Sequence, residues 1–354
     1  MGVFEMPEFD RHEEVVFRHD AATGLRAIIA IHSTVLGPAA GGCRMWAYAS
    51  SSDAAGDVLR LSRGMSYKNA MANLAFGGGK AVIIADPKHP KTPELFEAYG
   101  RFVNSLGGRY ITAEDVGTTT TDMENVARQT RYVSGLARHA GGVGGDPGPK
   151  TALGVYLGLK AAVKFRLGRS DLKGLKVAVQ GVGGVGYHLC RLLAEEGARL
   201  IVADVRAAAT ERAADEWGAL PVGAQDIIDQ DADVFAPCAL GAILNMQSIP
   251  RLRAKVVAGA ANNQLALDRD GLALHAAGVL YAPDYVINAG GIINVFHEYH
   301  GVSSEAQVHA AIAAIPARLT EIFERSRREN RPTNAVADEL ARARIEVGHT
   351  RLVA

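Results

Sequence analysis

Cysteine is scarce in this sequence, and the few cysteines are poorly placed for metal binding. The three, Cys43, Cys190 and Cys238, are odd in number and far apart, which is typical of free thiols in a reducing compartment. The 11 histidines are scattered, and neither Cys-x-x-Cys nor His-x-x-x-His spacing occurs. The sequence therefore argues against a structural zinc site, and we expect no bound metal.

Excess charge of one sign and long apolar runs are also absent. The 38 Lys and Arg residues balance 38 Asp and Glu residues, so no overall field would draw the protein to nucleic acid or to acidic membranes. No apolar run approaches the roughly 20 residues that cross a bilayer. The first residues are acidic and lack the apolar core of a signal peptide. We expect a cytoplasmic protein without nucleic-acid or membrane partners.

The length and composition indicate an ordinary globular protein of two domains. The chain has 354 residues, of which 48% are hydrophobic and 21% are charged, and domains commonly hold about 150 residues. The clearest break is at residues 139–149, with five glycines and two prolines. We therefore predict domains over 1–140 and 141–329. The helices of about 330–354 are expected to pack back on the first domain or on a neighbouring subunit.

Three consecutive glycines followed by a lysine stand out in the first domain. Gly77, Gly78 and Gly79 lead into Lys80 and an apolar run at 81–85 that predicts a strand. A second glycine-rich stretch covers 36–44. We interpret both stretches as loops, since glycine allows unusual backbone angles and close approach. Lysine loses its charge readily when desolvated, so Lys80 is a candidate base. The alternative is a tight turn with a solvent-facing lysine.

A second lysine lies on the apolar stripe of a predicted helix over 53–72. Val58, Leu61, Met65 and Ala72 share one face of that helix, and Lys68 lies on the same face. A charge there is costly unless it is paired or its stem reaches out to water. Lys68 is therefore either a snorkelling surface residue or a cation that receives a substrate carboxylate.

An aspartate, Asp115, follows the predicted strand 109–113 and precedes a helix. Thr121 and Glu124 match a capping box for that helix. Ligands of open α/β sheets lie at such carboxyl ends of strands. The alternative for Asp115 is a residue that only forms the turn. Other expected elements of this domain are strands over 13–17 and 25–31, joined by the turn 20–24, and a helix over 94–105.

The second domain carries a G-x-G-x-x-G pattern in the context of dinucleotide binding. Gly181, Gly183 and Gly186 follow a predicted strand over 175–180 and open a helix to about 196. Asp204 ends the next predicted strand, 200–203. An acidic residue there accepts hydrogen bonds from the ribose and repels a 2′-phosphate, which favours NAD over NADP. Arg206 could soften that preference. The alternative is a glycine-rich helix start packed on a sheet.

Further strands predicted over 232–236, 255–259 and 278–282 end in loops that would line the crevice of a doubly wound parallel sheet. A helix over about 151–166, which Thr151 could cap, precedes them. Long helices are expected over 304–328 and 333–347. A nicotinamide cofactor implies hydride transfer. Two lysines and an aspartate suit a small substrate with a carboxylate and an amine or carbonyl.

These stretches resemble the glutamate/leucine/phenylalanine/valine dehydrogenase family, and its leucine/valine branch most. The similarity runs from about Leu25 to Gly301 and includes 36–42, 65–69, 77–80, 115–118, 260–264 and 281–291. It implies an α/β substrate and oligomerisation domain, a Rossmann-like NAD domain with one reversed strand, and a cleft between them. It also implies a homo-oligomer.

The resemblance implies a reaction and a role for each site residue. An L-amino acid, NAD and water would give the 2-oxo acid, ammonium and NADH. Lys68 would bind the substrate carboxylate. Lys80 would be a neutral base beside the charged Lys68 and would activate water, and Asp115 would exchange protons with the amino nitrogen. Asn262 or Asn263 would lie near the nicotinamide. The cofactor residues would be Thr151, Gly181, Val182, Gly183, Gly184, Val185, Gly186, Asp204, Val205, Cys238, Ala239, Asn262, Asn263 and Asn288.

The substrate side chain is expected to be apolar. Glutamate-specific members have a lysine where Ala40 stands, just before Gly41 and Gly42, and a serine where Val295 stands. A second carboxylate would be buried here without a partner, which is costly. Ala40, Met65, Ile292 and Val295 would form the pocket, and Gly41 and Gly42 are also expected to bind the substrate, while Gly77 to Gly79 would leave room for it. Leucine, valine or isoleucine fit it, and phenylalanine or another aromatic amino acid is the alternative.

Two more distant alternatives stay open. The first is a non-catalytic NAD-binding regulator on the same fold, which the presence of Lys68, Lys80 and Asp115 disfavours. The second is a 2-hydroxy-acid dehydrogenase, whose chemistry needs a histidine beside an arginine. No histidine lies in the glycine-rich stretches of the first domain.

Overall fold

The computed structural model describes residues 2–86, 90–136, 143–301 and 304–353, with side chains to residue 348. The chain forms two compact units, each described below by itself. Unit 1 holds residues 1–146, 294–305 and 341–354, and unit 2 holds 147–293 and 306–340. The predicted boundary stretch 139–149 lies partly outside the described residues. Within the described residues, no helix is long and apolar enough to cross a membrane.

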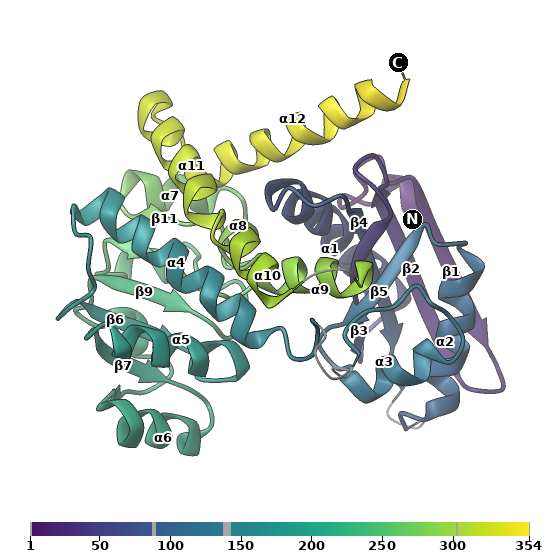
Figure 1. Cartoon of the computed structure of the whole chain (residues 1–354), viewed down its shortest axis with the longest axis horizontal. Coiled ribbons are helices and arrows are strands. Elements are labelled where there is room, and N and C mark those ends of the chain that lie inside the picture. The colour runs from purple at the N-terminus through teal and green to yellow at the C-terminus, as the bar shows by residue number, and fades with distance from the viewer. Residues whose placement is uncertain (1, 87–89, 137–142, 302–303, 354) are drawn as a thin grey trace. The chain divides into compact units, whose positions relative to one another are not determined.

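Unit 1 is built on a mixed five-stranded sheet in the order β1-β2-β4-β3-β5, drawn in purple to blue in Figure 1. The predicted hairpin is confirmed, since β1 and β2 pair antiparallel around the turn after Asp20. β2 pairs antiparallel with β4, and β4, β3 and β5 are parallel neighbours. The strands are β1 (Glu14–Asp20), β2 (Leu25–Ser33), β3 (Ala39–Trp46), β4 (Gly77–Ile84) and β5 (Tyr110–Glu114).

Helices cover both faces of this sheet because the central strands are apolar on both sides. Val82 and Ile84 of β4 pack in a core with α1 (Ser51–Met71). Ala81 and Ile83 pack in a second core with α2 (Pro93–Ser105) and α3 (Thr120–Ala127). Side chains alternate along a strand, so Lys80 lies on the face that α1 covers. A short 3-10 helix, Val3–Glu5, precedes β1.

The predicted glycine-rich loops are wrong except at 36–38, where Gly37 lies in the turn before β3, because the other glycines lie inside strands. Gly41 and Gly42 belong to β3, and Gly77 to Gly79 open β4. Glycine in a strand interior marks a place where another group approaches the backbone closely. A Cβ atom at Gly78 would lie 2.1 Å from the backbone nitrogen of Ser66, so here glycine lets α1 lie directly on β4.

Unit 2 contains a six-stranded sheet in the order β11-β10-β9-β6-β7-β8, drawn in teal to green in Figure 1. All its paired strands are parallel. The reversed strand implied by the family resemblance is therefore wrong for the described strands, since crossover connections keep the direction of each one. The strands are β6 (Lys176–Gln180), β7 (Arg199–Ala203), β8 (Leu220–Pro221), β9 (Val234–Pro237), β10 (Val256–Val257) and β11 (Leu280–Tyr281).

Nine named helices, α4 to α12, lie in the described part of the chain after residue 146. They are α4 (Gly148–Leu167), α5 (Gly184–Glu195), α6 (Ala207–Trp217), α7 (Asp270–Ala276), α8 (Asp284–Ile287), α9 (Gly290–His300), α10 (Glu305–Ile312), α11 (Ile315–Glu329) and α12 (Thr333–Val353), with 3-10 turns at Ile227–Asp229 and Ile249–Arg251. The single helix predicted over 304–328 is two helices, because Pro316 cannot donate the backbone hydrogen bond that would continue α10 into α11.

Two predicted helix caps are also wrong. The helix α3 begins at Thr120, and its capping box joins Thr119 to Asp122 rather than Thr121 to Glu124. Both pairs have the right spacing, but Thr119 has the extended backbone that a cap requires. The helix α4 begins at Gly148, so Thr151 lies within its first turn, where its hydroxyl donates to the Pro147 carbonyl at 3.0 Å.

The end of α12 belongs to unit 1. The Nε of Arg342 donates to the Tyr67 hydroxyl on α1 at 2.7 Å, and Arg344 reaches the Met71 carbonyl at 3.4 Å. Arg344 therefore supplies a donor and a positive charge to the carboxyl end of α1, which favours cations.

Candidate functional site

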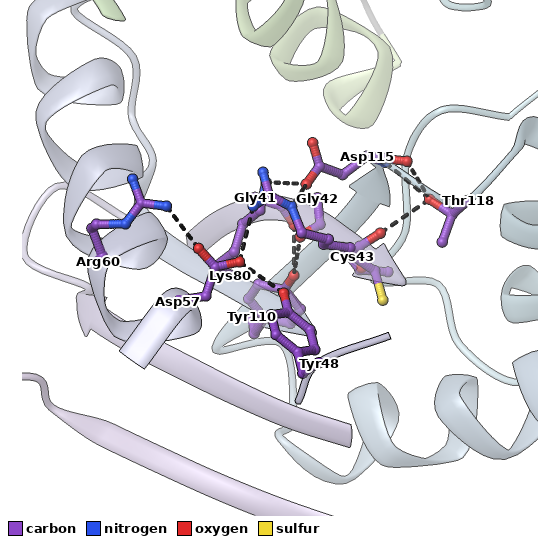
Figure 2. A network of polar contacts seen from close by, with 12 residues as sticks. Gly41, Gly42, Cys43, Tyr48, Asp57, Arg60, Lys80, Tyr110, Asp115 and Thr118 are labelled. Atoms are coloured by element: carbon purple, nitrogen blue, oxygen red, sulfur yellow. Dashed lines mark hydrogen bonds and ion pairs between the residues drawn. The ribbon is translucent and has the colours of Figure 1, made fainter. Parts of the chain in front are cut away.

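Lys80 and Asp115 form an ion pair in unit 1. The Lys80 Nζ lies 2.9 Å from the Asp115 Oδ2, and the two side chains are only 8% and 16% exposed. Figure 2 shows the two groups pointing toward one another. Lys80 lies on the central strand β4, while Asp115 directly follows the edge strand β5. The two therefore meet across β3, which lies between these strands.

Glycines in β3 make that meeting possible. A Cβ atom at Gly42 would lie 2.6 Å from the Glu114 carbonyl oxygen and 2.7 Å from the Asp115 Cβ, both below normal contact. A Cβ atom at Gly41 would lie 1.9 Å from the Gly79 carbonyl oxygen. The absent side chains thus let the backbone of β4 and the end of β5 lie close to β3, which brings Lys80 within reach of Asp115.

Hydrogen bonds fix the loop that carries Asp115. Its backbone N–H donates to the Thr118 Oγ1 at 2.9 Å, and that hydroxyl donates to the Cys43 carbonyl on β3 at 3.0 Å (Figure 2). Burial acts to raise the pKa of Asp115, but the charges of Lys80 and Arg44 outweigh it and hold this pKa below its ordinary value. Asp115 is therefore a carboxylate with a fixed backbone.

A set of charged residues missed by the sequence analysis extends from this pair. Arg44 donates from Nε to Asp115 at 3.3 Å and from Nη1 to Asp57 on α1 at 2.9 Å. Tyr48 and Arg60 bind Asp57 as well. A signal was present, since Arg44 follows Gly41 and Gly42 in a buried strand. Its partner could not be found by spacing, because Asp57 lies on a helix that crosses the sheet.

The other predicted substrate residues divide between the two units. Met65 lies over β3, with its Cγ 3.1 Å from the position of a Gly41 Cβ, and the partly buried Lys68 follows one turn later on α1. Ala40 is buried in β3 beside Gly41. Val295 lies in the part of α9 that belongs to unit 1, whereas Ile292 belongs to unit 2. The structure thus brings together Lys80, Asp115, Gly41, Gly42 and Met65, and leaves Ile292 in the other unit.

The glycine turn of unit 2 has the geometry of a phosphate-binding loop. Gly181 has a φ of +92°, and a Cβ there would lie 2.9 Å from the Ala239 nitrogen. A Cβ at Gly186 would lie 1.9 Å from the Gly181 carbonyl oxygen, so glycine lets α5 start directly against the turn. Gly183 caps α5 without a side chain. The backbone N–H groups at this helix start can therefore face an anion.

Asp204 lies at the end of β7, as predicted, and closes the turn. Its Oδ2 accepts from the Val182 N–H at 2.8 Å, and its Oδ1 accepts from the Arg206 N–H at 2.9 Å. Burial acts to raise the pKa of Asp204, but the Arg206 and Val182 amides hold it below its usual range. The Arg206 guanidinium, 65% exposed, pairs with the same carboxylate at 3.3 Å.

A cavity of about 760 Å³ opens beside Asp204 within unit 2. Its lining includes the predicted cofactor residues Gly181, Gly183, Asp204, Val205, Cys238 and Ala239. Residues of β6, β7 and β9, or of the turns directly after them, form much of the wall, at the carboxyl edge of the sheet where ligands of such sheets bind. The volume suits the adenosine half of a dinucleotide.

The remaining predicted cofactor residues lie outside that lining. Asn288 is buried, and its Nδ2 donates to the Asn262 Oδ1 at 2.7 Å and to the Ala260 carbonyl at 3.0 Å. Its Oδ1 has no partner among the described atoms. Asn263 adopts a left-handed backbone with φ of +51°. Val182 and Gly184 line a smaller hollow beside Arg206, whereas Thr151, Val185 and Gly186 line neither cavity.

Two family models match this chain over most of its length. Residues 11–132 match the model of the Glu/Leu/Phe/Val dehydrogenase dimerisation domain. Residues 203–341 match the model of Glutamate/Leucine/Phenylalanine/Valine dehydrogenase. The first match covers the Lys80–Asp115 pair. The second begins at the end of β7, in the parallel sheet of unit 2, and covers Asp204.

Similar proteins align over nearly the whole chain. The leucine dehydrogenase of Geobacillus stearothermophilus is 52% identical over 346 residues, 98% of this chain and 94% of that protein. The phenylalanine dehydrogenase of Bacillus thermotolerans is 46% identical over 96% of this chain and 89% of its own length. The crystal structure of L-tryptophan dehydrogenase from Nostoc punctiforme superposes with a TM-score of 0.83 at 46% identity, covering 96% of this chain and 97% of that one.

Proposed function

Because this chain belongs to the glutamate/leucine/phenylalanine/valine dehydrogenase family, we propose that it catalyses the NAD-dependent, reversible oxidative deamination of an apolar L-amino acid. The products are the 2-oxo acid, ammonium and NADH. The observation that carries the proposal is the buried Lys80–Asp115 pair, held at 2.9 Å in a chain that resembles leucine dehydrogenase from end to end.

The roles of the residues in unit 1 follow from their chemistry. Lys68 binds the substrate carboxylate with its ammonium group, beside Met65 on α1. Asp115, held as a carboxylate, takes a proton from the substrate nitrogen and returns it later. Lys80, at hydrogen-bonding distance from Asp115, exchanges protons with it. Once Lys80 has given up its own proton, its neutral amine accepts the proton of the water that attacks the imine. Gly41 and Gly42 let the neighbouring strands lie close to β3, so that Lys80 and Asp115 act on the same substrate.

We assign NAD(P) binding to unit 2 and substrate binding and oligomerisation to unit 1. The cradle at Gly181 and Gly183 and the cavity beside Asp204 fit a dinucleotide. When bound, the cofactor accepts the hydride that leaves the substrate Cα. The Asp204 carboxylate favours NAD, because a 2′-phosphate placed there would be repelled. Asn262, Asn263 and Asn288 are proposed to hold the nicotinamide end.

The preferred substrates in this proposal are leucine, valine and isoleucine. Ala40, Met65 and Val295 offer no charged group to a second carboxylate, so glutamate is a poor substrate. An aromatic amino acid is the second candidate, favoured by the small Ala40 and by the similarity to phenylalanine and tryptophan dehydrogenases. A pocket that differs by one methylene discriminates only about 10- to 200-fold, so mixed specificity is expected.

A panel of kcat/KM values tests this proposal. Leucine, valine, isoleucine, phenylalanine, tryptophan and glutamate are each measured with NAD and with NADP. Highest values for the branched substrates with NAD support the proposal, and highest values for phenylalanine or tryptophan support the second candidate. In the reverse direction, NADH oxidation with a branched 2-oxo acid must require ammonium. Turnover without ammonium would contradict amino-acid dehydrogenation. Light scattering of the active enzyme checks the proposed homo-oligomer.

A further inference from the structure

A chain of alternating charges runs from Lys80 into the space between β3 and α1. Lys80 binds Asp115, and Asp115 binds Arg44 at 3.3 Å. Arg44 binds Asp57 at 2.9 Å, and Asp57 binds Arg60 at 2.7 Å through its other oxygen. Figure 2 shows Asp57 with Arg60 on one side and the Tyr48 hydroxyl on another. Each charge therefore has an opposite charge at hydrogen-bonding distance.

The middle of this chain is shielded from water. The side chains of Arg44 and Asp57 are 18% and 15% exposed. Burying an arginine costs more than one carboxylate normally returns, unless the geometry is good and its other N–H groups are satisfied. Arg44 meets that condition because its planar guanidinium donates to two carboxylates on different elements, through Nε to Asp115 and through Nη1 to Asp57.

Asp57 is in turn fixed from three directions. The Tyr48 hydroxyl donates to its Oδ2 at 2.7 Å, Arg44 donates to the same oxygen, and Arg60 donates to its Oδ1. Its ordinary role could be a surface ion pair of α1 with Arg60, three residues later. That role does not explain Tyr48 or Arg44, which come from the other side of the carboxylate.

We propose that Arg44 is a positioning residue that holds the Asp115 carboxylate at Lys80, and that Asp57, clamped by Tyr48 and Arg60, fixes Arg44 for that purpose. The inference rests on the proposed function, in which Asp115 and Lys80 exchange protons during turnover. It adds a row of ion pairs, contributed by β3 and α1, that holds Asp115 in place beside Lys80.

The charges around Asp115 have opposite effects on its carboxylate according to their sign. The charged groups around Asp115 are the cations Lys80 on β4 and Arg44 on β3, with the anion Asp57 on α1 beyond Arg44. Cys43, Tyr48 and Tyr110 also interact electrostatically with Asp115, and burial raises the pKa of each. Removing the Arg44 charge raises the pKa of the Asp115 carboxyl, whereas removing the Asp57 charge lowers it further.

The test measures kcat, KM and the acidic limb of the pH profile of kcat/KM for three variants. Arg44→Gln is expected to move that limb up by about one pH unit, because one opposite charge is lost beside the pair. Asp57→Asn is expected to move it down by roughly 0.3 unit, since its charge is farther away and screened. Both lower kcat about tenfold or more, because Asp115 loses its fixed position.

Arg44→Lys separates charge from geometry. It keeps the cation but replaces the rigid guanidinium, whose Nε and Nη1 bind separate carboxylates, with a single ammonium nitrogen on a flexible stem, so the limb returns toward wild type while kcat stays low. The matched control is Arg101→Gln, which removes an arginine, 51% exposed, paired with Asp20 at 3.8 Å on the same unit. Its profile and kcat are expected to equal those of wild type.

Two outcomes would overturn the inference, and they are distinguishable. If the wild type turns over its amino acid but Arg44→Gln and Asp57→Asn keep its kcat and limb, or shift the limb in the same direction, Arg44 does not position Asp115. If the wild type shows no amino-acid turnover, the proposed function fails and this inference fails with it. Near-UV circular dichroism of each variant shows whether a loss of kcat comes from unfolding. If Arg44→Gln is unfolded, the kcat and pH profile of Arg44→Lys decide whether Arg44 positions Asp115.

Discussion

The glycine at position 42 gives a prediction whose size can be worked from the structure. In Gly42→Ala, the new Cβ would lie 2.6 Å from the Glu114 carbonyl oxygen and 2.7 Å from the Asp115 Cβ, whereas ordinary contacts begin at 3.4 Å. The end of β5 must therefore move away from β3 by about 0.8 Å at the tighter contact. The obstacle is largely backbone, so no flexible side chain can turn aside.

This displacement moves Asp115, which directly follows β5, away from Lys80. Added to the present 2.9 Å between the Lys80 Nζ and the Asp115 Oδ2, it takes the two groups beyond hydrogen-bonding distance. A misplacement near 1 Å costs about 100-fold in rate, and overfilling a packed site costs about 1–3 kcal/mol of unfolding free energy. We therefore expect kcat to fall about 100-fold, with a modest decrease of the urea midpoint.

A glycine of the same unit provides the control for Gly42→Ala. Gly56 lies inside α1, and a Cβ there would find its nearest neighbours, in Glu8 and Met6, at 3.6 Å. Gly56→Ala should keep full kcat and gain about 0.5–1 kcal/mol of stability, because alanine favours the helix. Steady-state kinetics and urea unfolding are measured on both variants. If Gly42→Ala kept a kcat within twofold of wild type, Gly42 would not be the spacer between β3 and Asp115.

Three further predictions concern other parts of the chain. Burial, with His12 nearby, lowers the pKa of His32 to about 4 from 6.5, so the unfolded chain binds more protons. The contribution of neutral His32 to the unfolding free energy is therefore fully present above pH 6.5, and about 3 kcal/mol of it is lost as the pH drops to 4. Urea unfolding at several pH values should show a smaller loss in His32→Asn than in the wild type, and an equal loss would refute this. Arg206→Ala leaves the Asp204 carboxylate without its cation, so the NAD over NADP ratio of kcat/KM should rise about two- to fivefold, as an exposed ion pair allows; an unchanged ratio would count against it. Burial raises the pKa of Cys43 and of Cys238 to about 12 and raises that of Cys190 too, so iodoacetamide at pH 8 should label the three thiols only after denaturation; rapid labelling of the native enzyme would contradict this.

Local sequence patterns were enough to predict the glycine turn, the helix and the acidic residue of the candidate dinucleotide site in unit 2. The turn from Gly181 to Gly186, the helix α5 and Asp204 at the end of β7 lie within 24 residues. Their geometry depends on contacts inside this segment, such as the close approach of Gly186 to the Gly181 carbonyl and the Asp204 carboxylate that accepts the Val182 N–H, although Gly181 also approaches the more distant Ala239. Glycine permits the turn and the helix start supplies the donors. The family resemblance, confirmed by the matches over most of the chain, followed from the same kind of short pattern.

Only the tertiary structure decided how the first domain uses its glycines and charges. Gly41, Gly42 and the Gly77–Gly79 run have the composition of loops, yet they lie in strands. What makes glycine necessary there is a neighbour distant in sequence, and for Gly42 that neighbour is Asp115, more than 70 residues away. A local pattern carries no information about such a neighbour, because sheet order β2-β4-β3-β5 decides which strands meet.

The same reason explains the two charges that the sequence did not indicate. Arg44 and Asp57 have ordinary neighbours in sequence, and nothing in their spacing points to Asp115 or Tyr48. They meet because α1 crosses the face of β3 and β4 over the absent side chains of glycine. The sequence by itself determined which groups carry the chemistry, Lys68, Lys80 and Asp115 as proposed. The packing of α1 on the sheet decided which other charges hold Asp115 at Lys80.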